Sequence, residues 1–255
     1  MIKQSFVLML GRFLLLGGLF AGCASPSKSS KAAEKLNVLM IAVDDLRPEL
    51  GCYGNSLIQT PNIDKLARQG IVFKNAYCNI PVCGASRASL LTGTRPTKYR
   101  YLRYNERADQ MYPAAIPISQ HLKNHGYKTI SNGKIFHVEE DHAQSWDENW
   151  RVQKSGGGWR NYLLPENQQL ETIKDQRGPA FEAAEVPDSA YNDGQLALKA
   201  IRDIANLKNS KEPFFLSVGF IKPHLPFNAP QKYWDLYDRS DFSPTTQEHW
   251  PENAA

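Results

Sequence analysis

The chain has 255 residues, of which 42% are hydrophobic and 22% are charged, a balance typical of a globular protein and not of a disordered or fibrous one. Its formal net charge is +4, but residues 1–35 hold five basic residues against one acidic residue, so the remaining 220 residues carry 25 of each sign. A neutral body argues against a surface that follows nucleic-acid phosphates, and we expect no nucleic-acid partner.

The N-terminal segment has the features of a bacterial export signal. Lys3 and Arg12 flank apolar residues that run to Ala21, a stretch too short and too interrupted to span a membrane comfortably. It ends in Leu-Phe-Ala-Gly-Cys, which resembles a lipobox with Phe20 in the position where Leu is usual. We therefore expect residues 1–22 to be a lipoprotein-type signal peptide, with ordinary cleaved secretion as the alternative.

Either signal exports the chain, and a lipid on Cys23 would make it a periplasmic or outer-membrane lipoprotein. Residues 23–36 are then a polar tether, and the lipid is the only membrane contact expected. Three cysteines follow, Cys52, Cys78 and Cys83, so at least one stays unpaired even where disulfides are permitted. Their spacing does not match a zinc site.

The body begins with a predicted strand at 37–43, a nearly continuous apolar run typical of a strand buried on both faces of a parallel sheet. Apolar stripes closed by glycines predict helices, and apolar runs after them predict strands. In chain order these are a helix at 61–69, a strand at 71–73, a short helix beginning beside Cys83, a helix at 118–124, a strand at 127–130, a helix at about 189–207 and a strand at 213–218. Alternating strands and helices imply βαβ units and an α/β fold.

The segment 141–187 has a different composition, rich in Trp, Gln, Glu and Gly, and shows no sustained period. We expect an insertion of irregular structure. It is either a source of substrate-contacting loops or a packed surface excursion.

Polar clusters follow three of the predicted strands. These are Asp44-Asp45, Lys134 with His137, and Lys222 with His224. Because ligands of open α/β sheets bind outside the carboxyl ends of the strands, the three clusters could line one crevice. Taken singly, each is also compatible with a helix cap, a solvated turn or a structural histidine.

The segment from Cys83 to Gly93 predicts a short helix whose N-terminal amides favour negative charge beside Cys83. Arg87 lies one turn along and can reach back. A thiolate nucleophile is the simplest interpretation. The phosphatase loop that pairs Cys with an Arg six places on is excluded, because position 89 is Ser.

Cys83-x-Ala-Ser86-Arg87 followed by Leu91-Thr92-Gly93 resembles the sulfatase signature, in which the cysteine is oxidised to formylglycine after synthesis. Further segments agree with the sulfatase family in order along the chain: Asp44-Asp45, Leu50-Gly51-Cys52-Tyr53-Gly54, Thr60-Pro61-Asn62-Ile63-Asp64, Gly133-Lys134-x-Phe136-His137, Pro213-Phe214-Phe215-Leu216 and Lys222-Pro223-His224-x-Pro226-Phe227. The ordered set is similar to the iduronate-2-sulfatase branch in particular.

The resemblance implies an alkaline phosphatase-like three-layer sandwich with a mostly parallel sheet, of which residues 37–255 would be the N-terminal part of the catalytic domain. It also implies hydrolysis of sulfate esters, with a sulfated carbohydrate as substrate and a formylglycine-generating maturase as partner.

The resemblance assigns the metal and the nucleophile residue by residue. Asp44, Asp45 and the modified Cys83 would be ligands of Ca²⁺. The metal and Arg87 would hold the hydrated aldehyde of formylglycine, one hydroxyl of which attacks sulfur. The placed positive charges suit a transition state that spreads negative charge onto the leaving oxygen.

The remaining assignments concern the sulfate and the protons. Lys134 and His137 would bind the sulfate and the diol, with His137 as a candidate base. His224 would protonate the leaving alcohol, since imidazole titrates near neutral pH. Lys222 is a weaker candidate for sulfate contact.

Two features depart from the family pattern. Ala85 stands where Pro is commonest, a form that the family associates with the radical-type maturase of anaerobic bacteria. The chain also ends at Ala255, before the region where family members supply a further Asp with a neighbouring His or Asn, and another Lys. We therefore expect the N-terminal portion of a sulfatase. The alternatives are a phosphonate or phosphodiester hydrolase of the same superfamily and an inactive, surface-tethered fragment.

Overall fold

The computed structural model describes residues 34–152, 158–173 and 178–243. The predicted signal peptide, the lipidation site Cys23 and most of the predicted tether lie outside these ranges. Within them, no helix is both long enough and apolar enough to cross a membrane.

A four-stranded parallel sheet forms the centre, in the order β1-β5-β2-β3. The strands are β1 (Val38–Val43), β5 (Phe214–Phe220), β2 (Lys128–Gly133) and β3 (Glu148–Trp150), and all three neighbouring pairs are parallel. β5 lies between β1 and β2 and is buried along most of its length, as its largely apolar sequence, interrupted by Ser217, requires. The predicted parallel α/β sheet is confirmed, and so are its strands near 37–43, 127–130 and 213–218.

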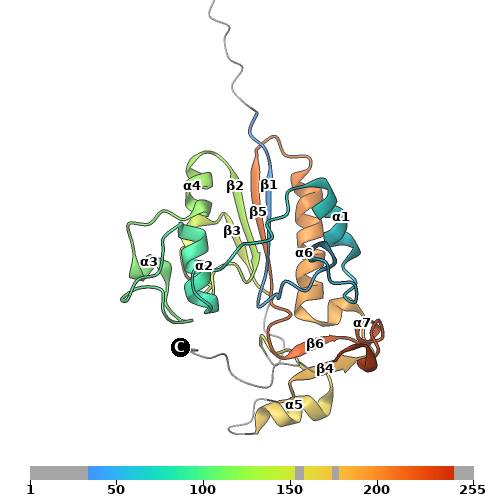
Figure 1. Cartoon of the computed structure of the whole chain (residues 1–255). Coiled ribbons are helices and arrows are strands. Elements are labelled where there is room, and N and C mark those ends of the chain that lie inside the picture. The colour runs from blue at the N-terminus through green and yellow to red at the C-terminus, as the bar shows by residue number, and fades with distance from the viewer. Residues whose placement is uncertain (1–33, 153–157, 174–177, 244–255) are drawn as a thin grey trace, which may run out of the picture. The chain divides into compact units, whose positions relative to one another are not determined.

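Helices cover both faces of this sheet (Figure 1). One face carries α2 (Cys83–Thr92), α3 (Ala108–Met111) and α4 (Ile118–Asn124), and the other carries α6 (Asn192–Leu207), with α1 (Pro61–Gln69) beside it. The helices expected near 61–69, 118–124 and 189–207, and the one expected at Cys83, are therefore confirmed. The arrangement is helix, sheet, helix, in three layers.

Two buried clusters join the layers. On the α2 face, Ala85, Ala88 and Leu91 pack with Phe136, Trp146 and Phe215. On the α6 face, Leu196 and Ala200 pack against Ile130, Leu216 and Val218. Both sides of β5 thus belong to the core, which holds the carboxyl end of this strand rigidly between its neighbours.

The predicted strand at 71–73 is wrong. These residues form no regular element and pair with no strand in the described part of the chain, and Ile71 and Phe73 are 83% and 70% exposed. An apolar run has the composition of a strand, but a strand also needs a partner. The inner neighbour of β1 is β5, which comes from much further along the chain.

The segment 141–187 is more regular than predicted. It contributes β3 to the edge of the main sheet, the helix α5 (Pro165–Thr172) and the strand β4 (Phe181–Ala184). β4 pairs in parallel with β6 (Phe227–Pro230), which α7 (Gln231–Trp234) follows. Strands of three and four residues are too short to show a period of two, and their partners are remote in sequence.

Four short 3₁₀ turns complete the described elements. They are Gly51–Tyr53, Ala143–Ser145, Asp188–Ala190 and Arg239–Asp241.

Candidate active site

The carboxyl end of β1 buries one aspartate and exposes the next. The N–H of Asp44 donates to the carbonyl of Phe220 (3.1 Å), which extends the β1–β5 ladder by one residue. Asp45 then adopts a left-handed conformation with φ 54°, and the chain turns. The side chain of Asp44 is 4% exposed and that of Asp45 is 55% exposed, so the two carboxylates occupy different environments.

Asp44 accepts hydrogen bonds from two cations. Nη2 of Arg87 donates to Oδ1 (2.9 Å), and Nζ of Lys134 donates to Oδ2. Burial alone would raise the pKa of Asp44, but the hydrogen bond from Lys134 and the charge of Arg87 outweigh it and hold the pKa below its usual value. Three chain segments are therefore joined at one buried carboxylate.

Cys83 is the first residue of α2, and its position depends on the glycine that follows it. A Cβ at Gly84 would lie 1.8 Å from the carbonyl oxygen of Tyr104, so only glycine allows the first turn to approach this backbone so closely. One turn along, Nη1 of Arg87 also donates to the carbonyls of Lys134 and Ile135.

The loop after β2 carries Lys134 and His137. The N–H of Lys134 donates to the carbonyl of Gly219 on β5 (2.8 Å). A Cβ at Gly219 would lie 2.0 Å from the carbonyl oxygen of Lys134, which is backbone and cannot move aside cheaply. Glycine at 219 is thus what allows this loop to lie across the end of β5.

His137 faces the predicted nucleophile. Its Nδ1 lies 3.5 Å from Sγ of Cys83, and its ring meets that of Tyr104 edge to face at 5.6 Å. Burial and the positive charge of Lys134 lower the pKa of His137 to about 4. The imidazole is therefore neutral near pH 7 and able to accept a proton.

His224 follows β5 and lies beside Asp45. Its Nδ1 is 2.7 Å from the carbonyl of Leu225, which requires an N–H at Nδ1, and its Nε2 is 3.8 Å from Oδ2 of Asp45. Ligand atoms of Asp44, Asp45 and His224 all lie within 4.8 Å of one another. Among the described residues, the group able to hold a metal thus includes His224, for which the sequence predicted roles as an acid and in substrate binding, and does not include Cys83.

A cavity of about 1050 Å³ joins most of these side chains, with Cys83, Lys134, His137 and His224 in its wall. Tyr104, Arg151, Trp159 and Asp193 also line it. None of these four residues was predicted to be a site residue, because none lies in a motif that resembles the sulfatase family. Arg151 and Trp159 lie within the segment whose regular structure was not predicted.

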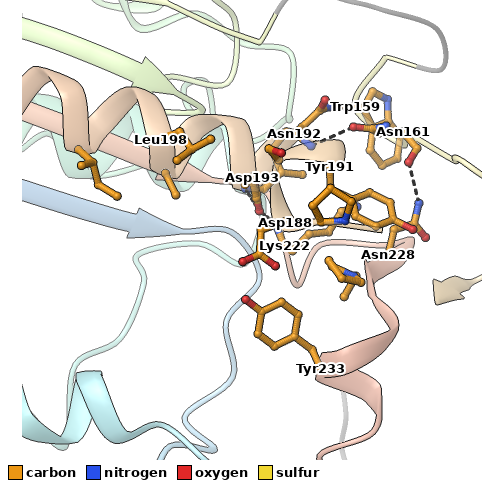
Figure 2. Close-up of a pocket in the computed structure, with 18 residues that line it drawn as sticks. Trp159, Asn161, Asp188, Tyr191, Asn192, Asp193, Leu198, Lys222, Asn228 and Tyr233 are labelled. Atoms are coloured by element: carbon orange, nitrogen blue, oxygen red, sulfur yellow. Dashed lines mark hydrogen bonds between the residues drawn. The ribbon is translucent and has the colours of Figure 1, made fainter. Parts of the chain in front are cut away.

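Lys222 is placed differently from the prediction. It lines an adjoining cavity of about 600 Å³, near Asp193 (Figure 2). Its Nζ donates to the carbonyls of His224 (3.2 Å) and Pro226 (2.5 Å). Burial lowers the pKa of Lys222 to about 8, with the charge of Asp193 opposing the shift and that of Lys134 adding to it. In this structure Lys222 holds the loop that carries His224.

Comparisons with known proteins point to one family. Residues 36–249 match the family model described as Sulfatase. The chain is 36% identical over 251 residues to iduronate 2-sulfatase of Mus musculus, and this alignment covers 94% of the chain and 44% of the relative. It is 35% identical over 242 residues to a sulfatase of Formosa agariphila, and this alignment covers 88% of the chain and 46% of the relative.

A solved structure shares the fold. The phosphonate monoester hydrolase of Agrobacterium radiobacter superposes with a TM-score of 0.58 over 82% of this chain and 45% of that chain, at 22% identity. The alkaline phosphatase-like fold expected from the sequence is thereby confirmed. The chain spans less than half the length of the curated relatives named above. With the family model matched over most of its residues, the chain belongs to the sulfatase family.

Proposed function

We propose that this protein is a sulfuric ester hydrolase that uses a formylglycine derived from Cys83 together with bound Ca²⁺. The observation that carries the proposal is the convergence of Cys83, Lys134 and His137 at one cavity, with the buried Asp44 linking Lys134 to Arg87. These residues come from three segments far apart in the sequence. Membership of the sulfatase family supports the same reaction.

The donor set fits a hard cation. Carboxylate oxygens of Asp44 and Asp45 are the ligands that Ca²⁺ prefers. Each oxygen of Asp44 already accepts one hydrogen bond, but a carboxylate oxygen has a second lone pair to offer. We propose the residue formed from Cys83 as a further ligand. A cation bound here would supply positive charge to the sulfate oxygens.

Arg87 and Lys134 supply fixed positive charge next to the nucleophile. Both side chains are nearly buried, so their charges act in a medium less screened than water. We propose that Lys134 contacts the sulfate and that Arg87 orients the group formed from Cys83. Because sulfate ester cleavage places negative charge on the leaving oxygen, preorganised cations lower the barrier.

The two histidines suit opposite roles in proton transfer. His137 is neutral and its Nδ1 faces the position of Cys83, so it can accept a proton from a hydroxyl formed there. His224 holds the N–H of Nδ1 against the carbonyl of Leu225, which leaves Nε2 as the ring nitrogen that can pass a proton to a leaving alcohol.

The substrate, the partner and the location belong to the same proposal. One relative is named for iduronate, a uronic acid, and we propose a sulfated carbohydrate as substrate. We propose a radical-type maturase for Cys83, because Ala85 stands in the signature. We also propose export and lipidation at Cys23, which rest on the N-terminal sequence alone.

The test compares sulfate and phosphorus esters on the matured protein. The protein is produced together with a maturase, and mass spectrometry of the Cys83 peptide reports conversion of the thiol to the aldehyde. We expect sulfate release from an aryl sulfate or a 2-O-sulfated uronate, and none from Cys83→Ala. A phosphonate monoester tests the second candidate, which the shared fold with a phosphonate monoester hydrolase favours. Faster phosphonate hydrolysis, or sulfate hydrolysis that survives Cys83→Ala, would overturn the proposal.

A further inference from the structure

Arg151, directly after β3, forms hydrogen bonds to the loop that carries Lys134 and His137. Its Nη2 donates to the carbonyl of Phe136 (2.8 Å) and its Nη1 to the carbonyl of His137 (3.3 Å). Arg87 also binds this loop, because its Nη1 donates to the carbonyls of Lys134 and Ile135. Two guanidinium groups therefore bind four consecutive carbonyls, from residue 134 to residue 137.

The charge of Arg151 has no close counter-ion. Within the described ranges Arg151 forms no ion pair. Its Nε is inaccessible to solvent and has no hydrogen-bond partner among these residues. The acidic groups whose charges favour it are Glu139 and Glu140, while Arg87 repels it. Burying a guanidinium without a direct ion pair costs desolvation free energy that the charges of these two glutamates offset only in part, so a role in packing alone would be better filled by an uncharged side chain.

The geometry of the guanidinium suits the positioning of a loop. Its planar fork presents parallel N–H groups that can reach neighbouring carbonyls, which a single ammonium cannot do in the same way. Arg151 also lines the cavity together with Cys83, Lys134 and His137. The loop also lies against Gly219, where an added Cβ would be 2.0 Å from the carbonyl oxygen of Lys134. Contacts from three separate elements, α2, β5 and the end of β3, thus hold the loop.

We propose that Arg151 is a positioning residue for the reaction: it fixes the 134–137 loop so that Nδ1 of His137 faces the group at position 83. This inference rests on the proposed function. Because Arg151 acts through His137, its loss should slow turnover while leaving substrate affinity nearly unchanged.

The kinetic test separates positioning from substrate binding. For Arg151→Ala we expect kcat to fall by roughly 10- to 100-fold, the range for residues that orient a functional group, with KM changed by less than about 3-fold. Added guanidinium ion should restore part of the lost kcat. Arg151→Lys should keep the charge but recover less activity than guanidinium does. The control is Arg202→Ala, an exposed arginine on α6, which should behave as the parent. A raised KM with unchanged kcat would show that Arg151 binds the substrate instead.

A second measurement needs no turnover and so distinguishes failure of this inference from failure of the proposed function. In unmatured protein, the alkylation rate of the Cys83 thiol by iodoacetamide is followed by mass spectrometry of its peptide. Arg151→Ala and His137→Ala should slow alkylation by a similar factor, and the double variant should be no slower than either. Circular dichroism confirms that each variant is folded. Independent effects that multiply in the double variant, or an unchanged rate in Arg151→Ala, would overturn the inference.

Discussion

The buried carboxylate of Asp44 and the ammonium of Lys134 form an ion pair across the carboxyl end of β5. The two residues follow β1 and β2, which flank β5 in the sheet. The pair is shared with Arg87 on α2, so one carboxylate links the sheet to the helix that begins at Cys83. The position of the site's cations is therefore tied to the stability of the fold.

Removal of the Asp44 carboxylate should destabilise the protein. Asp44→Ala leaves Arg87 and Lys134 as buried cations without their partner, and we expect the free energy of unfolding to fall by roughly 3–5 kcal/mol. Urea unfolding in the presence of a chelator measures this without a contribution from metal. Asp45→Asn, at the exposed neighbouring position, should cost less than about 1 kcal/mol. Equal losses in the two variants would contradict the role of the buried ion pair.

Calcium should stabilise the parent through Asp45. A ligand that binds only the folded state raises the melting temperature, and the rise grows with the logarithm of the ligand concentration once that concentration exceeds the dissociation constant. We expect Ca²⁺ to raise the Tm of the parent and to have little effect on Asp45→Asn, which keeps the shape of the side chain but loses its charge. Asp188→Asn is the control, because Asp188 pairs with Lys232 away from the proposed site. A Ca²⁺ response that persists in Asp45→Asn would place the ion elsewhere.

Gly219→Ala should displace the 134–137 loop. The added Cβ would lie 2.0 Å from the carbonyl oxygen of Lys134, so the loop has to move and both the free energy of unfolding and kcat should fall. We expect a stability loss of roughly 1–3 kcal/mol, the range for overpacking. At Gly70 the Cβ would meet its nearest atom at 3.6 Å, so Gly70→Ala should leave kcat unchanged. Parent-like kcat in Gly219→Ala would show that the loop tolerates the shift.

Lys222 should make the stability rise with pH. Because its pKa is lowered to about 8 in the folded protein, the folded state binds fewer protons than the unfolded state between about pH 8 and the usual lysine value of 10.5. The free energy of unfolding of the parent, relative to that of Lys222→Gln, should therefore increase across this window and be flat below it. Denaturant unfolding between pH 6 and about pH 10 measures the difference. Lys208→Gln, at an exposed lysine, should show no such slope.

Much of the fold could be predicted because its signals are local. β1 is a continuous apolar run, β5 is apolar except at Ser217, and α6 carries a clear apolar stripe between polar residues. The strand predicted at 71–73 and the irregular segment predicted at 141–187 were wrong for one reason. A short strand is defined by its partner, and the partner of β4 is β6, which lies beyond β5 in the chain.

By itself, the sequence determined the family and the residues that gather at the strand ends, because carboxyl ends of parallel strands meet at one edge of a sheet. Only the tertiary structure decided which contacts each of those residues makes and which cavity it lines. The turn at Asp45 brings His224 beside it, the buried carbonyls of its own loop turn Lys222 toward another cavity, and Arg151 reaches the loop of His137 from β3. These contacts depend on strand order and on backbone carbonyls, which no pattern of side chains along the sequence records.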